Sequence, residues 1–180
     1  AIALYEQSIA TFERLGLPLD QGRGLSNLGF THYKLGAHDE ARRCFEQALT
    51  LLNQVGDVRE QGVAHLHLAE TALAQGQHQA AREHCAQAMR RFGRIGFELG
   101  QADVDRVYAG VARREGRAAV AERYLREAIA VYQEHGDELN LAETHRELGE
   151  LLAELGQGAQ AREELDRSRA MFETLTRVEE

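Results

Sequence analysis

The sequence predicts an all-α protein: a solenoid of about nine antiparallel helices that repeat along the chain in pairs. Three observations carry this prediction. A glycine recurs every 20 residues, the segments between the glycines consist of good helix formers, and a pattern of small and large residues recurs every 40 residues. The glycines are Gly16, Gly36, Gly56, Gly76, Gly96, Gly116, Gly136 and Gly156.

Each glycine of this series marks the predicted end of one helix. Glycine adopts the left-handed conformation that ends many helices at little steric cost. The segments between the glycines are rich in Ala, Leu, Glu, Gln and Arg and nearly free of helix breakers. We therefore expect helices of roughly 15–18 residues, each about 25 Å long.

Alternate segments differ in kind, so the repeat is 40 residues long and contains two helices. In the second helix of each pair, steps of four, three and four residues place four series of positions on one helical face. The series are Ala1, Ala41, Ala81, Ala121 and Ala161; Tyr5, Phe45, Cys85, Leu125 and Leu165; Ser8, Ala48, Ala88, Ala128 and Ser168; and Phe12, Leu52, Phe92, Tyr132 and Phe172. The first helix of each pair carries a large residue followed by a small one: Leu28-Gly29, Leu68-Ala69, Tyr108-Ala109 and Leu148-Gly149. Alternating small and large residues allow neighbouring helices to pack closely.

This combination resembles the tetratricopeptide repeat, whose usual period is 34 residues. The 40-residue form is similar to the repeats of Pins-type polarity adaptors, kinesin light chains, and bacterial transcriptional regulators and signalling ATPases. The resemblance covers the whole chain and implies one right-handed superhelix over residues 1–180. Residues 1–20 would be the second helix of a truncated repeat, followed by four repeats at 21–56, 57–96, 97–136 and 137–180. Two features depart from the family: the closing proline is absent, and Leu25, His65, Asp105 and His145 replace the aromatic residue that usually begins the first helix.

The resemblance also implies a concave groove, lined by the first helices, that binds a protein or peptide partner. The candidate groove residues grade from apolar and aromatic, through basic, to acidic. They are Asn27, Phe30, Tyr33, Lys34, Leu66, Glu70, Leu73, Arg106, Arg113, Arg114, Glu147 and Glu150. The apolar members are as compatible with packing between helices as with ligand binding. The arginines either pair with a carboxylate of the ligand or belong to a solvated face with local ion pairs.

Composition narrows the class of protein. The formal charge of −8 argues against nucleic acid as a partner. No apolar run approaches the ~20 residues of a membrane span. Cys44 and Cys85 form no CxxC pair, so we expect neither a disulfide framework nor a zinc site, and a reducing, cytoplasmic location. Basic charge is almost all arginine, which suggests a GC-rich bacterial source.

The sequence offers no catalytic motif or cofactor site. Eight histidines are present, but none shows the HExxH spacing that places two imidazoles on one helical face. No GxxxxGK[ST] loop occurs, and the glycines are predicted to end helices. We therefore expect a protein that is not an enzyme and holds neither a metal nor a cofactor.

Three functions fit these observations. The first is a protein- or peptide-binding adaptor, part of a larger bacterial regulatory or signalling protein. The second is the ligand- or peptide-sensing domain of a transcriptional regulator. The third is self-association, since the apolar faces of the terminal helices would be incompletely covered and could pair in a homodimer.

Overall fold

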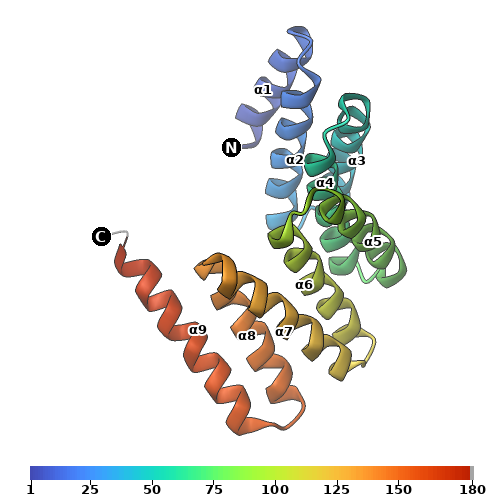
Figure 1. Ribbon diagram of the computed structural model, residues 1–180. Helices are drawn as coiled ribbons and strands as arrows, with labels where there is room; N and C mark the ends of the chain where they lie inside the picture. The colour runs from blue at the N-terminus through green and yellow to red at the C-terminus, as the bar shows by residue number, and fades with distance from the viewer. Residues whose placement is uncertain (179–180) are drawn as a thin grey trace. The chain divides into compact units, whose positions relative to one another are not determined.

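A computed structural model describes residues 1–178, with side chains described up to residue 176. Over this part of the chain it contains nine α-helices and no strand, which confirms the all-α prediction (Figure 1). The helices are α1 (Ile2–Arg14), α2 (Pro18–Lys34), α3 (His38–Val55), α4 (Val58–Ala74), α5 (His78–Ile95), α6 (Glu98–Arg114), α7 (Ala118–His135), α8 (Glu138–Glu154) and α9 (Gly158–Val178). None of these helices has the length and apolar content needed to cross a lipid bilayer.

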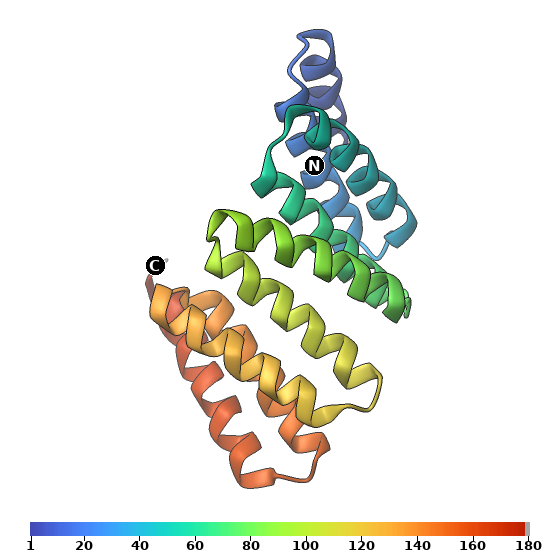
Figure 2. The same ribbon diagram turned by 45° about the vertical axis from the view of Figure 1, so that its right-hand side comes forward.

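The chain divides into two compact units, Ala1–Gly100 and Gln101–Glu180, with the boundary inside the first turn of α6. In unit 1, α2 packs against α3 and α4 packs against α5; in unit 2, α8 packs against both α7 and α9. The α8–α9 pair, drawn in orange to red, is antiparallel in both views (Figures 1 and 2). Each unit is thus a stack of helical hairpins.

The glycines end the helices by the predicted mechanism. All eight have a positive φ, between 65° and 79°, and no other described residue type has one. In α3, α5 and α7 the glycine follows the last helical residue directly and is the left-handed cap. Each of these glycines therefore ends one helix and allows the chain to turn into the next.

Polar caps begin two of the first helices. The carboxylate oxygen Oδ1 of Asp57 accepts a hydrogen bond from the amide of Glu60 at 3.0 Å, and Asp137 accepts one from Asn140 at 3.1 Å. The helix α2 starts at Pro18, before the predicted repeat boundary at residue 21, because proline suits the first turn of a helix, where no amide donor is needed.

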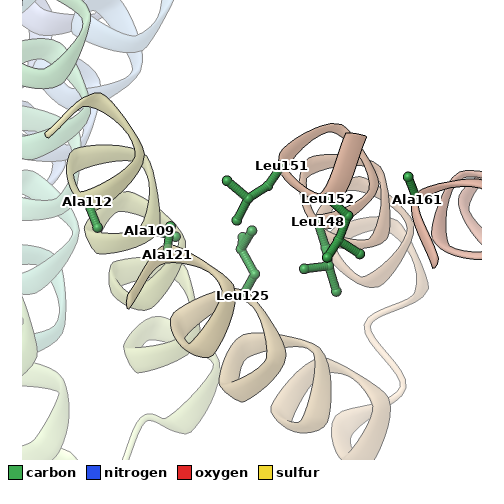
Figure 3. Packing of buried hydrophobic residues seen from close by; sticks show 8 residues of the cluster. All are labelled: Ala109, Ala112, Ala121, Leu125, Leu148, Leu151, Leu152 and Ala161. Carbon is green, nitrogen blue, oxygen red and sulfur yellow. The ribbon is translucent and has the colours of Figure 1, made fainter. Parts of the chain in front are cut away.

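Small residues of the first helices meet large residues of the second helices in the core. A methyl group added to Gly29 would lie 2.7 Å from Cε1 of Phe45, and one added to Gly149 would lie 2.7 Å from Cγ of Leu165. In unit 2 the core continues through an alanine- and leucine-rich cluster from α6, α7, α8 and α9 (Figure 3). Its buried members are Ala109, Ala112, Ala121, Leu125, Leu148, Leu151, Leu152 and Ala161. The close approach of each helix pair therefore depends on size matching across the interface.

Gly29→Ala tests this size matching. We expect it to lower the free energy of unfolding by about 1–3 kcal/mol, because the added methyl group overpacks Phe45. The control is Gly93→Ala in α5, where an added methyl group has no neighbour within 4 Å; it should be stabilising by about 0.5–1 kcal/mol. Urea denaturation of the three proteins measures both changes, and equal effects of the two substitutions would contradict the packing argument.

Candidate functional site

The first helices of unit 1 present an aromatic and polar surface that we call the α2/α4 face. It consists of Arg23, Asn27, Phe30 and Lys34 from α2, and Val63, His67 and Glu70 from α4. On each helix these positions recur at intervals of three or four residues, which places them on one side. Two contacts link the helices at this face: the rings of Phe30 and His67 lie 5.4 Å apart, and Nε of Arg23 donates to Glu60, at the start of α4, at 3.1 Å.

Phe30 is the apolar centre of this face. It is 39% exposed, although it stacks on Tyr33 with ring centroids 6.4 Å apart. The ammonium group of Lys34, the chain's single lysine, lies 5.0 Å from the centroid of the Phe30 ring. His67 connects the surface to the core, because its ring also stacks on the fully buried Phe45 at 5.1 Å. An exposed aromatic ring is therefore held in place by a cluster that reaches the interior.

Polar groups surround the aromatic centre. Nδ1 of His67 and Oε2 of Glu70 are 2.9 Å apart. Burial, and secondarily the charge of Glu70, raise the pKa of Tyr33 above its ordinary value. Asn27 is exposed and offers both a donor and an acceptor. The face can thus form hydrogen bonds with an extended backbone beside an apolar contact.

Leu66 and Leu73, the other two candidate residues of α4, are less exposed than Phe30. Leu66 is only 6% exposed and belongs to the core, where it packs rather than faces solvent. Leu73 is half-buried. The exposed apolar surface of these first helices therefore comes from Phe30, with half-buried Val63 beside it.

In unit 2 the basic and acidic candidate residues are brought together by α6 and α8. Arg106 donates to Asn140 at 2.9 Å, to Glu143 at 2.9 Å and to Glu147 at 2.6 Å. Burial alone would lower the pKa of Arg106, but the charge and hydrogen bond of Glu147, with further help from Tyr132 and Glu143, raise it above its usual value. This guanidinium is therefore permanently charged and already engaged.

Arg113 forms a second set of contacts between the same helices. Its Nε donates to Glu154 at 2.9 Å, and Nη1 lies 3.7 Å from a carboxylate oxygen of Glu150. The hydrogen bond from Arg113 lowers the pKa of Glu154. Arg114 is exposed. A ligand carboxylate would have to compete with these glutamates for Arg106 and Arg113, whereas Arg114 is open to solvent.

Several polar contacts were not anticipated from the sequence. The hydroxyl of Tyr132 donates to Asp103 at 2.6 Å. His65 and His84 approach through their Nδ1 atoms at 3.1 Å, and Nδ1 of His145 lies 2.6 Å from Oε2 of Glu164. Both histidine contacts join residues 19 apart, and this constant spacing is the signal that could have found them. Among the described residues, no group of three or more His, Cys, Asp or Glu side chains is arranged to hold a metal ion.

Comparisons with known proteins agree with this architecture. The family model described as the tetratricopeptide repeat matches residues 1–54, 20–94 and 100–174. A search of curated proteins finds no match.

The similar solved structures share little sequence with the chain. BtubC from P. vanneervenii is 20% identical, with a TM-score of 0.80 over 96% of this chain and 72% of its own. A Rap protein complexed with Competence and Sporulation Factor is 18% identical, with a TM-score of 0.87 over 96% of this chain. This chain covers 49% of that Rap protein. Repeats of a putative kinesin light chain from Podosopora anserina are 19% identical, with a TM-score of 0.62 over 98% of this chain and 87% of their own.

The chain consists of paired helices that end at glycines and that pack through small and large residues facing each other. These features define a repeat protein built from helical hairpins. The chain belongs to the tetratricopeptide repeat family, because the family model matches most of its length.

Arg106 and Arg146 occupy the same position in successive repeats and provide a test of the α6–α8 contacts. The Arg106 side chain is 17% exposed, whereas that of Arg146 is 49% exposed and pairs with Glu150 within its own helix. We expect Arg106→Ala to lower the free energy of unfolding by about 2 kcal/mol, because it removes charge-assisted hydrogen bonds from a largely buried guanidinium to the half-buried carboxylates of Glu143 and Glu147. Arg146→Ala should cost about 0.5 kcal/mol or less. Chemical denaturation checks both values, and a loss for Arg106→Ala as small as that for Arg146→Ala would contradict this assignment.

Proposed function

We propose that the chain is a non-catalytic protein- or peptide-binding module and that its α2/α4 face contacts the partner. The observation that carries this proposal is the exposed Phe30 ring, fixed by Tyr33, Lys34 and His67 and bordered by the exposed amide of Asn27. Aromatic anchors surrounded by polar groups are typical of binding surfaces. Family membership supports the proposal, because the repeat is in general an interaction scaffold.

The remaining candidate residues have separate roles in this proposal. Arg114, with the outer edges of Glu147 and Glu150, would contribute polar contacts on unit 2. Arg106 and Arg113 would act indirectly, by holding α8 in position against α6. Leu66 and Leu73 would support the α2/α4 face from below. We further propose a cytoplasmic location within a larger bacterial regulatory or signalling protein, without direct binding to nucleic acid or membrane.

A peptide- or ligand-sensing domain is the second candidate. The likeness to a Rap protein complexed with a factor supports it, although at 18% identity this likeness concerns the fold. Sensing and adaptor functions would use the same face. They differ in consequence: a sensor would change conformation when the ligand binds, and an adaptor would not.

Selection from a random-peptide display library tests the binding proposal. We expect the wild-type chain to enrich a set of related peptides and Phe30→Ala to weaken their binding by about tenfold or more, as expected for loss of an aromatic anchor. The control is Leu35→Ala, which removes a 67%-exposed leucine just beyond the end of α2 and should leave affinity unchanged. Equal affinity of the wild type and Phe30→Ala, with Phe30→Ala folded by circular dichroism, would contradict the role given to this face.

Self-association through the terminal helices is the third candidate. No residue of α1 is buried, and Leu4 is 69% exposed. In the corresponding second helices α3, α5 and α7, the residues equivalent to half-buried Tyr5 and Phe12 are buried. The apolar surface of α1 is therefore less covered than that of the equivalent helices α3, α5 and α7.

Sedimentation over a concentration series tests this third candidate. We expect a monomer–dimer equilibrium that Leu4→Glu shifts to monomer, since the substitution places a charge on the apolar surface. A wild-type chain that stays strictly monomeric at high concentration would exclude self-association through α1.

A further inference from the structure

One position of the repeat places a first-helix residue against a second-helix residue 19 positions later. In unit 1 it holds His65 and His84, with their Nδ1 atoms 3.1 Å apart. In unit 2 it holds His145 and Glu164, whose Nδ1 and Oε2 atoms are 2.6 Å apart. The same position therefore carries a pair of imidazoles in one unit and an imidazole–carboxylate pair in the other.

The His65–His84 contact requires at least one neutral imidazole. One Nδ1 must donate a proton and the other must accept it, so the contact is lost when both rings are protonated. His65 is 7% exposed, and two adjacent imidazolium charges at this depth would be poorly solvated. The His145–Glu164 contact has no such requirement, because a carboxylate oxygen accepts a hydrogen bond from an imidazole N–H without a second imidazole.

The groups around the histidine pair reinforce this difference. Arg91 and Arg90 act on His65, and the Arg91 guanidinium is held by Gln61 at 3.2 Å and Gln87 at 2.8 Å. Glu83 and Glu46 act on His84 and favour its protonated form, but burial outweighs them and lowers its pKa. Around the unit 2 pair, Nη1 of Arg167 lies 3.3 Å from a carboxylate oxygen of Glu164. His145 and Glu164 line a shallow cavity to which Arg126 also contributes.

We propose that the His65–His84 contact is an acid-sensitive latch between α4 and α5, which opens on mild acidification while the equivalent α8–α9 contact holds. The closed contact keeps at least one ring neutral, whereas the open state lets both rings take up protons, so acidification favours opening. Release of α4 from α5 would expose the helix that also carries Val63, His67 and Glu70 of the α2/α4 face.

The pH range of the latch follows from the two states of His65. Burial, followed by the charges of Arg91, His84 and Arg90, lowers its pKa from 6.5 to about 4. The unfolded imidazole takes up a proton near pH 6.5 and the folded one only near pH 4. The unfolded state therefore binds more protons between these values, and the stability of the α4–α5 pair falls as pH decreases from about 6.5 towards 4.

Hydrogen exchange of the wild-type chain measures the latch. After correction for intrinsic exchange, the opening equilibrium of α4 and α5 amides should rise about tenfold or more between pH 7 and pH 5. The amides of α8 provide the internal control and should change little. An equal response of α4–α5 and α8 would overturn the proposal.

Reciprocal substitutions separate the latch from general acid sensitivity. His84→Glu gives unit 1 the histidine–carboxylate pair of unit 2 and should remove the acid response of α4–α5. Glu164→His gives unit 2 the paired imidazoles and should create an acid response in α8–α9. If His84→Glu does not fold, His65→Leu supplies the residue that the first repeat carries at this position, Leu25, and should also remove the response. Retention of the full acid response in the folded variant would overturn the proposal.

The effect of the latch on binding rests on the proposed function. A peptide selected at pH 7 should bind the wild type more weakly at pH 5 and bind His84→Glu equally at both values. Hydrogen exchange is measured without peptide and therefore tests the latch independently of binding. If the wild type shows the exchange response but binds no peptide, the latch proposal is supported and only the binding proposal is contradicted.

Discussion

The close contact between a small residue on one helix and a large residue on its partner is the constraint on which the rest of the structure depends. Gly29 leaves room for Phe45, and Gly149 leaves room for Leu165, because neither glycine has a Cβ atom. In the second repeat Ala69 takes the place of Gly29 and the smaller Cys85 that of Phe45, and in the third repeat Ala109 and Leu125 stand at these positions. In the first two repeats a larger residue on the first helix thus accompanies a smaller one on the second, and such size matching allows paired helices to approach closely.

The packing of the helices also determines which surface residues of successive first helices come into contact. Residues 37 positions apart, on successive first helices, come into contact in both units. In unit 1 this brings Phe30 against His67, and in unit 2 it brings Arg106 against Glu143. The same register therefore produces an exposed aromatic face in one unit and a network of ion pairs in the other. The difference lies in the residues placed on the scaffold, which is where the function of a repeat protein resides.

The sequence could predict the helices and their ends, because both depend on local chemistry. The series that includes Gly56, Gly96 and Gly136 identifies left-handed caps without any knowledge of the fold. The start of α2 at Pro18 lies three residues before the expected repeat boundary at residue 21, because a proline fits the first turn of a helix whatever the repeat register. Side-chain partners such as Arg106 and Glu147 lie 41 residues apart, and their pairing depends on helix packing that no local pattern encodes. Leu66 illustrates the same limit: helical spacing alone does not separate a residue beside an exposed face from one beneath it.

The central claim is that the α2/α4 face binds a partner, and the single lysine of the chain allows one direct measurement. Lys34 lies over the Phe30 ring, so an amine-reactive reagent reports on occupation of this face. Labelling rates of Lys34 would be measured by mass spectrometry with and without a saturating selected peptide, with an unrelated peptide at the same concentration as the control. We expect the selected peptide to slow labelling of Lys34 and the unrelated peptide to leave it unchanged. Unchanged labelling of Lys34 in the protein saturated with the selected peptide would contradict this claim.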